Sequence, residues 1–318
     1  MIETDVLGEP WQAETIGLPP DEEGAVVTTL VSRRAEESTG RAVLHLHGFS
    51  DYFFQTQYAE WWLARGYDFY AVDLRKYGRS LRPHQTPMYI TDLHDYFAEL
   101  DLAWDRIVRR DGHDRVIASA HSTGGLTLPL WAHHRQPDEL AGMVLNSPWL
   151  DLQGKAWMRT PAADAALARL ARSQPRREIP RQVSGFYGQS LHRDHHGEWE
   201  FNLDWRPIGS FPARAAWLHA IRRGHAELHA GLAVPAPVLV LSSGASTMPA
   251  AMGEDVFSHD IVLEVPQIRR WATSIGTQVT YTAVEGALHD VFLSRAGARE
   301  RGYDVLERWH SAFVDKPA

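Results

Sequence analysis

A serine flanked by small residues follows a short apolar run near the middle of the chain. The run 115–119 leads into Ala120-His121-Ser122-Thr123-Gly124-Gly125, and an amphipathic stretch follows. A strand that enters a sharp turn and opens a helix exposes a serine oxygen at the carboxyl edge of a sheet, and the residues two before and two after that serine must be small. Ala120 and Gly124 meet this demand, with alanine where glycine is usual. A serine at a helix start is more often an N-cap, but the preceding strand favours Ser122 as a nucleophile.

A serine hydroxyl becomes a good nucleophile when a neighbouring imidazole takes its proton and a carboxylate orients that imidazole. Among 17 histidines, His289 stands in a glycine-containing loop directly after a predicted strand, so we expect it to be the base. Two acids, Asp260 and Asp255, lie between the run Val-Leu-Val-Leu-Ser-Ser and a helix predicted near Pro266. We favour Asp260, because it precedes the segment that leads into this helix, and Asp255 remains the alternative. Asp290 is too close to His289 in the chain to orient it and is expected to be exposed or a local cap.

A second apolar run ends in a turn that can supply hydrogen-bond donors. Residues 43–46 read Val-Leu-His-Leu and are followed by His47-Gly48-Phe49. The acyl-transfer chemistry of such a serine needs main-chain N–H groups that face the developing oxyanion. We therefore expect the backbone amides of Phe49 and Thr123 to form an oxyanion hole.

Strands and helices alternate along most of the chain, as in a mostly parallel sheet covered by helices. The α/β class is therefore the expected fold. The predicted strands are 25–31, 41–47, 68–72, 115–119, 142–146, 237–241 and 278–284.

The alternation stops between residues 151 and 233, where no buried strand is predicted. We expect residues 1–150 to form the first part of the core, 151–233 an inserted cap, and 234–318 the second part of the core. The cap is rich in aromatic residues, which either line a pocket for an acyl chain or form a small core of the cap itself. Its large apolar residues are Trp157, Met158, Phe186, Tyr187, Trp199, Phe201, Trp205, Phe211 and Trp217.

Taken together, these motifs resemble the α/β-hydrolase superfamily, and particularly its branch of monoacylglycerol lipases, lysophospholipases and serine-aminopeptidase-like proteins. The matching segments are HGFSD at 47–51, DLRKYGRS at 73–80, AHSTGG at 120–125, SPWLD at 147–151, DIVLEV at 260–265 and GALHD at 286–290. The resemblance implies a catalytic triad of Ser122, Asp260 and His289, an oxyanion hole at Phe49 and Thr123, and a cap after Asp151. It also implies a structural loop beside the pocket, made by Asp73, Arg75, Gly78, Arg79 and Ser80.

The composition indicates which binding partners and which cellular compartment to expect. The 318 residues carry a formal net charge of −8 and no cysteine, so nucleic acid is not an expected partner and thiolate chemistry is excluded. The first residues show no basic flank before an apolar stretch, and no run is long enough to span a bilayer. We expect a cytoplasmic protein without stable membrane insertion, and the sequence does not predict its oligomeric state.

The predicted function is hydrolysis of a medium or long acyl ester, such as a monoacylglycerol or a lysophospholipid, through an acyl-enzyme and without metal or organic cofactor. The same machinery cleaves amides, lactones and C–C bonds, and a hydrolase fold can also serve as a small-molecule receptor with slow or no turnover. The pair His45 and His47 is typical of some metal-dependent hydrolases, but no further ligands are evident. His192, His195 and His196 are interpreted as polar residues of the cap.

Overall fold

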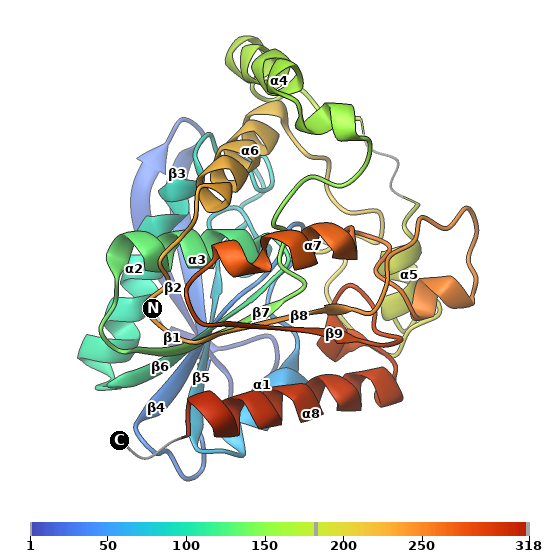
Figure 1. Ribbon diagram of the computed structural model, residues 1–318. Coiled ribbons are helices and arrows are strands. Elements are labelled where there is room, and N and C mark those ends of the chain that lie inside the picture. Colours follow the sequence, from blue (N-terminus) through green and yellow to red (C-terminus); the bar gives the residue numbers. More distant parts are fainter. Residues whose placement is uncertain (1, 181–183, 316–318) are drawn as a thin grey trace.

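A nine-stranded sheet runs through the computed structural model, which describes residues 2–180 and 184–315 (Figure 1). The strands lie in the order β1-β2-β3-β5-β4-β6-β7-β8-β9. The pairs among β1, β2, β3 and β5 are antiparallel, and β5, β4, β6, β7, β8 and β9 are parallel to one another. The bounds are β1 (Ile2–Thr4), β2 (Gln12–Asp21), β3 (Gly24–Arg33), β4 (Arg41–Leu46), β5 (Tyr67–Asp73), β6 (Arg115–His121), β7 (Leu140–Asn146), β8 (Val238–Ser243) and β9 (Val279–Val284). The predicted mostly parallel sheet is confirmed.

Helices cover both faces of the sheet, as the alternating sequence pattern predicts (Figure 1). One face carries α1 (Thr56–Leu63) and α8 (Ala296–Phe313), and the other carries α2 (Phe97–Asp105), α3 (Gly124–Arg135), α6 (Ala215–His229) and α7 (Val265–Trp271). Every residue of β5 is buried, because helices shield the sheet on both sides.

The segment between β7 and β8 is built from helices and loops. It contains a 3₁₀ turn (Ala156–Arg159), α4 (Pro161–Ser173), α5 (Phe186–Leu191) and α6, and no named strand falls within its described residues. Helix α4 stands out from the body of the molecule in Figure 1, and none of its residues is buried. Helix α6 packs against α3 and against a 3₁₀ turn at Leu93–Tyr96, so it joins the helical layer on the sheet.

A buried ionic network holds the loop after β5. Asp73 is fully buried, and its Oδ2 accepts hydrogen bonds from the Arg79 main-chain N–H at 3.0 Å and from Arg79 Nη1 at 2.9 Å. Arg79 also donates to both carboxylate oxygens of Asp5, at 2.5 and 2.8 Å. A Cβ on Gly78 would lie 2.5 Å from Asp73 Oδ2, so this position has no room for a side chain. The loop thus joins the first residues of the chain to the carboxyl end of β5.

Replacing Arg79 with alanine is expected to destabilise the protein by about 3–5 kcal/mol, because two buried carboxylates lose their partner. Urea unfolding with linear extrapolation measures this change in free energy. The matched control is Arg135→Ala, because Arg135 pairs with Asp101 where both side chains are more than 40% exposed, and at most about 1 kcal/mol is expected there. Equal unfolding midpoints for the two variants would show that the Arg79 network does not stabilise the fold.

Candidate active site

The loops that carry the predicted site residues all follow the carboxyl ends of parallel strands. Phe49 follows β4, Ser122 follows β6, Asp260 lies in the loop after β8, and His289 lies in the loop after β9. Parallel strands end at the same edge of a sheet, so the topology brings these four residues to one place.

Ser122 occupies the strained turn between β6 and α3. Its φ is +53°, in the left-handed region that a non-glycine residue rarely adopts. The turn is held by hydrogen bonds from Ser122 N–H to the Asn146 carbonyl at 3.1 Å and from Trp149 N–H to the Ser122 carbonyl at 2.9 Å. Ala120 remains within β6, fully buried and paired in register with Leu46. Alanine fits at this position because the positive φ falls on the serine and not on Ala120.

Two glycines allow α3 to start directly against the sheet. A Cβ on Gly124 would lie 2.5 Å from the His47 carbonyl oxygen and 2.8 Å from the Leu46 carbonyl oxygen. A Cβ on Gly125 would lie 2.5 Å from Pro148 Cβ. Any side chain here would push the helix away from β4 and shift Ser122, which explains the demand for small residues in the motif.

His289 joins Ser122 to Asp260 through two hydrogen bonds. Its Nε2 lies 3.0 Å from Ser122 Oγ, and its Nδ1 lies 2.9 Å from Asp260 Oδ2. Asp260 is fully buried, and its other oxygen accepts the main-chain N–H groups of Val262 and Leu263 at 2.8 and 2.7 Å. A carboxylate held in this way fixes the imidazole tautomer with Nδ1 protonated, which leaves Nε2 free to accept the serine proton.

The other two acids take different positions. Asp255 lies in a 3₁₀ turn (Glu254–Phe257) and accepts a hydrogen bond from the Val256 N–H, so the geometry favours Asp260 over Asp255 as the partner of His289. Asp290 is a local cap, since its Oδ1 accepts the Phe292 N–H at 3.0 Å. Of the two alternatives expected for Asp290, the local cap is confirmed, and the side chain is buried rather than exposed.

Asn146, at the end of β7, fixes the loop that carries His289. Its side-chain amide donates to Asp290 Oδ1 at 2.6 Å and accepts from the Val291 N–H at 3.1 Å. None of the sequence motifs includes this residue. A buried amide at the carboxyl end of a predicted central strand is the signal that points to it.

His121 and Tyr187 surround the imidazole. Their rings lie 4.7 and 5.5 Å from the His289 ring, centroid to centroid. Burial lowers the pKa of His121, which favours the neutral form of this ring beside His289. Burial and the charge of Asp290 raise the pKa of Tyr187 well above its ordinary value, so its hydroxyl stays protonated.

A buried ion pair connects the loop after Phe49 to the segment 151–233. Arg206 Nε lies 2.9 Å from Asp51 Oδ1, and both side chains are less than a tenth exposed. Burial raises the pKa of Asp51, but the charge of Arg206 together with several weaker interactions outweighs burial, so the pKa lies below its ordinary value. Sequence reasoning did not pair these residues, because 155 positions separate them and no motif includes Arg206.

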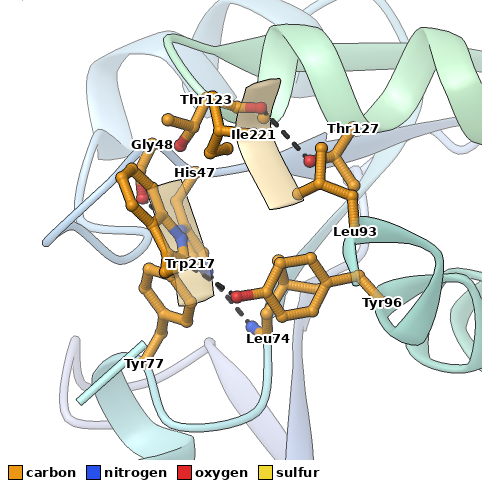
Figure 2. Close-up of a pocket in the computed structure, with 11 residues that line it drawn as sticks. His47, Gly48, Leu74, Tyr77, Leu93, Tyr96, Thr123, Thr127, Trp217 and Ile221 are labelled. Carbon is orange, nitrogen blue, oxygen red and sulfur yellow. Dashed lines mark hydrogen bonds between the residues drawn. The ribbon is translucent and has the colours of Figure 1, made fainter. Parts of the chain in front are cut away.

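One of the two predicted oxyanion donors, Thr123, lines a small cavity together with Gly48 of the His-Gly turn (Figure 2). A Cβ on Gly48 would lie 3.0 Å from Ser122 Cβ, so the His-Gly turn lies against Ser122. The Phe49 ring packs on Trp217 with centroids 4.2 Å apart. The cavity measures about 10 Å³, about the room of one water molecule. Its lining includes His47, Gly48, Leu74, Tyr77, Leu93, Tyr96, Thr123, Gly124, Thr127, Trp217 and Ile221.

The aromatic residues of the segment 151–233 divide between two roles. Phe201 is buried in a cluster with Tyr52, Phe54 and Leu288, and Trp199 and Trp205 pack on the same cluster. Trp217 alone among the aromatic residues of this segment lines the cavity beside Ser122. Trp157 is 64% exposed. Phe201 and its neighbours therefore pack against residues outside the segment and do not form a separate core of the cap, whereas the expectation of a pocket lining fits Trp217.

His45 and His47 make separate contacts. His45 Nδ1 lies 3.2 Å from Ser119 Oγ, and burial together with the charge of His121 lowers the pKa of His45 to about 3. His47 Nε2 accepts the Leu74 N–H at 3.1 Å. Neither belongs to a group of three potential metal ligands within the described part of the chain. Within residues 2–180 and 184–315, no helix is both long enough and apolar enough to cross a membrane.

The sheet order, the strand-turn-helix elbow and the loops at the carboxyl edge define the α/β-hydrolase fold. Solved structures support this assignment. A soluble variant of monoglyceride lipase from Saccharomyces cerevisiae, in complex with a substrate analogue, has a TM-score of 0.69 at 16% identity, with 96% of each chain covered. Monoacylglycerol lipase from Paleococcus ferrophilus has a TM-score of 0.59 at 20% identity, with 89% of this chain and 98% of the lipase covered. An esterase from Thermogutta terrifontis has a TM-score of 0.56 at 16% identity, with 95% and 99% covered.

The family follows from a sequence comparison. The family model described as serine aminopeptidase, S33, matches residues 37–295, which is most of the chain. The chain belongs to this family and is a hydrolase of the α/β-hydrolase type, as the resemblance of its motifs implied. A search of curated proteins finds no match.

Asp260→Asn is expected to slow labelling of Ser122 by a fluorophosphonate probe by about 10³–10⁴-fold, because the amide favours the wrong imidazole tautomer. Asp255→Asn is the matched control, and a change of no more than about twofold is expected from a charge that does not contact His289. Labelling rates measured by gel fluorescence separate the two acids. A large loss in Asp255→Asn with normal labelling in Asp260→Asn would reverse the assignment.

Proposed function

We propose that this protein hydrolyses carboxylic esters through an acyl-enzyme formed on Ser122. The observation that carries the proposal is the hydrogen-bonded chain from Ser122 Oγ through His289 to Asp260, with links of 3.0 and 2.9 Å. A nucleophile, a base and an orienting carboxylate in this arrangement are what acyl transfer requires.

In the proposed reaction, His289 Nε2 takes the proton of Ser122 as Oγ attacks the ester carbonyl. The tetrahedral intermediate then collapses, the alcohol leaves with the proton from His289, and the acyl group remains on Ser122. Water attacks this second ester with His289 again as base, and the acid product leaves. Asp260 stabilises the imidazolium in both halves, and its burial strengthens that attraction.

The main-chain N–H groups of Phe49 and Thr123 are proposed to bind the oxyanion. Thr123 is the residue after the nucleophile, and the Gly48 turn lies against Ser122. Preorganised donors of this kind each contribute about 2.7–4 kcal/mol to barrier lowering.

The substrate class proposed from the sequence is a medium or long acyl ester. Two of the similar structures are named as a monoglyceride lipase and a monoacylglycerol lipase, which agrees with this class. A cavity of about 10 Å³ does not hold such a chain, and we propose that it opens by movement of Trp217 when the substrate binds. We further propose that residues 151–233 act as the cap over the site, since Trp217 comes from this segment. A cytoplasmic location stays a prediction.

Ser122→Ala is expected to reduce hydrolysis of p-nitrophenyl butyrate by about 10⁴-fold or more, and wild-type enzyme is expected to release a burst of p-nitrophenol as the acyl-enzyme accumulates. Stopped-flow absorbance measures both. Ser173→Ala, an exposed serine on α4, is the control and should retain full activity. Activity that survives in Ser122→Ala would refute the mechanism. Tight ligand binding without turnover in the wild type would favour the alternative function as a receptor.

Trp217→Ala is expected to raise kcat/KM for p-nitrophenyl decanoate relative to acetate by about tenfold or more, because it opens the cavity to additional methylenes. Initial rates over a series of chain lengths give this ratio. The control is Trp157→Ala in the same segment, since Trp157 is 64% exposed and does not line the cavity. Wild-type rates that peak at acetate and fall thereafter would contradict the proposed medium or long acyl ester.

A further inference from the structure

Three side chains able to bind a metal ion meet on the surface, outside the proposed catalytic site. His94 comes from the 3₁₀ turn Leu93–Tyr96, His134 from the last turn of α3, and Glu227 from the last turn of α6. His94 Nε2 lies 3.1 Å from Glu227 Oε2, and His134 Nε2 lies 2.5 Å from Glu227 Oε1. One ligand atom from each residue falls within 4.8 Å of the other two.

We propose that His94, His134 and Glu227 bind one Zn²⁺ ion. Two imidazole nitrogens and a carboxylate oxygen are a donor set that zinc favours, whereas Mg²⁺ and Ca²⁺ prefer oxygen ligands. With metal–ligand bonds of about 2.1 Å, two ligand atoms on a tetrahedral ion lie roughly 3.4 Å apart. The spacings of 3.1 and 2.5 Å are shorter than this value by up to about 0.9 Å, so the side chains must rotate apart to admit the ion. The fourth position is left for water.

The ligands are accessible and partly preorganised. Their side chains are 30–40% exposed, so an ion can enter from solvent. The His94 ring stacks on Phe97 at 4.7 Å, and the His94 main-chain N–H donates to Asp92 Oδ1 at 3.1 Å. Asp92 in turn pairs with Arg223 of α6 at 2.9 Å. These contacts hold the turn that carries His94 against the helix that carries Glu227.

Hydrogen bonds from two imidazoles to Glu227 are the competing explanation for the same geometry. Exposed pairs of this kind contribute only about 0–1 kcal/mol each. The two explanations differ at Glu227→Gln, because a glutamine amide still accepts a hydrogen bond through its oxygen but is a poor zinc ligand. This variant therefore removes the ion with little change to the packing.

Binding of the ion would join α6 to α3 and to the turn that follows the β5 loop. Helix α6 also carries Trp217 and Ile221, which line the cavity beside Ser122. The ion therefore stabilises a helix that borders the proposed active site. The inference does not depend on Ser122 chemistry and holds whether or not the protein cleaves esters.

The test is equilibrium dialysis of the full chain, stripped of metal with a chelator, against Zn²⁺. The wild type is expected to bind one ion in a saturable site, and Glu227→Gln and His134→Ala are expected to bind it with a Kd at least about tenfold higher. His84→Ala is the matched control, since His84 is exposed and lies outside the cluster. It should bind zinc as the wild type does.

Thermal unfolding gives a second readout that does not require activity. Zinc at about a hundred times Kd is expected to raise Tm by several degrees in the wild type and in Ser122→Ala, but not in Glu227→Gln. Circular dichroism verifies that each variant is folded. Absence of saturable binding in the wild type, or equal affinity in the wild type and Glu227→Gln, would overturn the proposal.

Discussion

The close approach of α3 to the end of β4 is the constraint on which the site depends. At Gly124 the helix backbone lies so near the His47 and Leu46 carbonyls that a single methyl group would not fit. The same approach sets Gly48 against Ser122, so Ser122 and the turn that carries Phe49 form one packed unit. The parallel pairing of β4 with β6 places Leu46 opposite Ala120, and this register fixes where the two turns that follow these strands begin. A slip of one residue would turn every side chain of β6 to the other face of the sheet.

The groups around His289 determine how well a positive charge on its imidazole would be stabilised. The buried carboxylate of Asp260 has one oxygen satisfied by two main-chain N–H groups, and only the other faces the imidazole. The ring next to His289 belongs to His121. Because burial lowers the pKa of His121, its neutral form is favoured, and it would not oppose the positive charge that the proposed mechanism places on His289. Asn146 fixes the loop through Asp290 and Val291, and this converts an irregular segment into a rigid support.

The sequence predicts the central sheet well because its strands are buried on both sides and read as apolar runs. All seven predicted strands are present, from β3 to β9. It missed β1 and β2, since β2 carries two prolines and few apolar residues, as strands near a sheet edge can. Ser122, His289 and Asp260 follow motif order and could be chosen from the sequence. The pair Asp51 and Arg206 could not, because contact between residues so distant in the chain is a property of the fold alone.

The anchoring of α6 bears on how a substrate chain reaches the cavity. Arg222 of this helix pairs with Asp151 at 3.2 Å, where both side chains are at most a tenth exposed, and a Cβ on Gly224 would lie 2.5 Å from a Leu93 methyl carbon. Shifting the whole helix would break this buried pair, which costs about 3–5 kcal/mol. Rotation of the Trp217 side chain leaves the pair intact and gives up its aromatic contacts with Phe49 and Trp149, each worth about 0.5–1.5 kcal/mol. The lower cost of rotating Trp217 favours opening of the cavity by this side chain while α6 stays in place. An ion bound at Glu227 would hold α6 still more firmly.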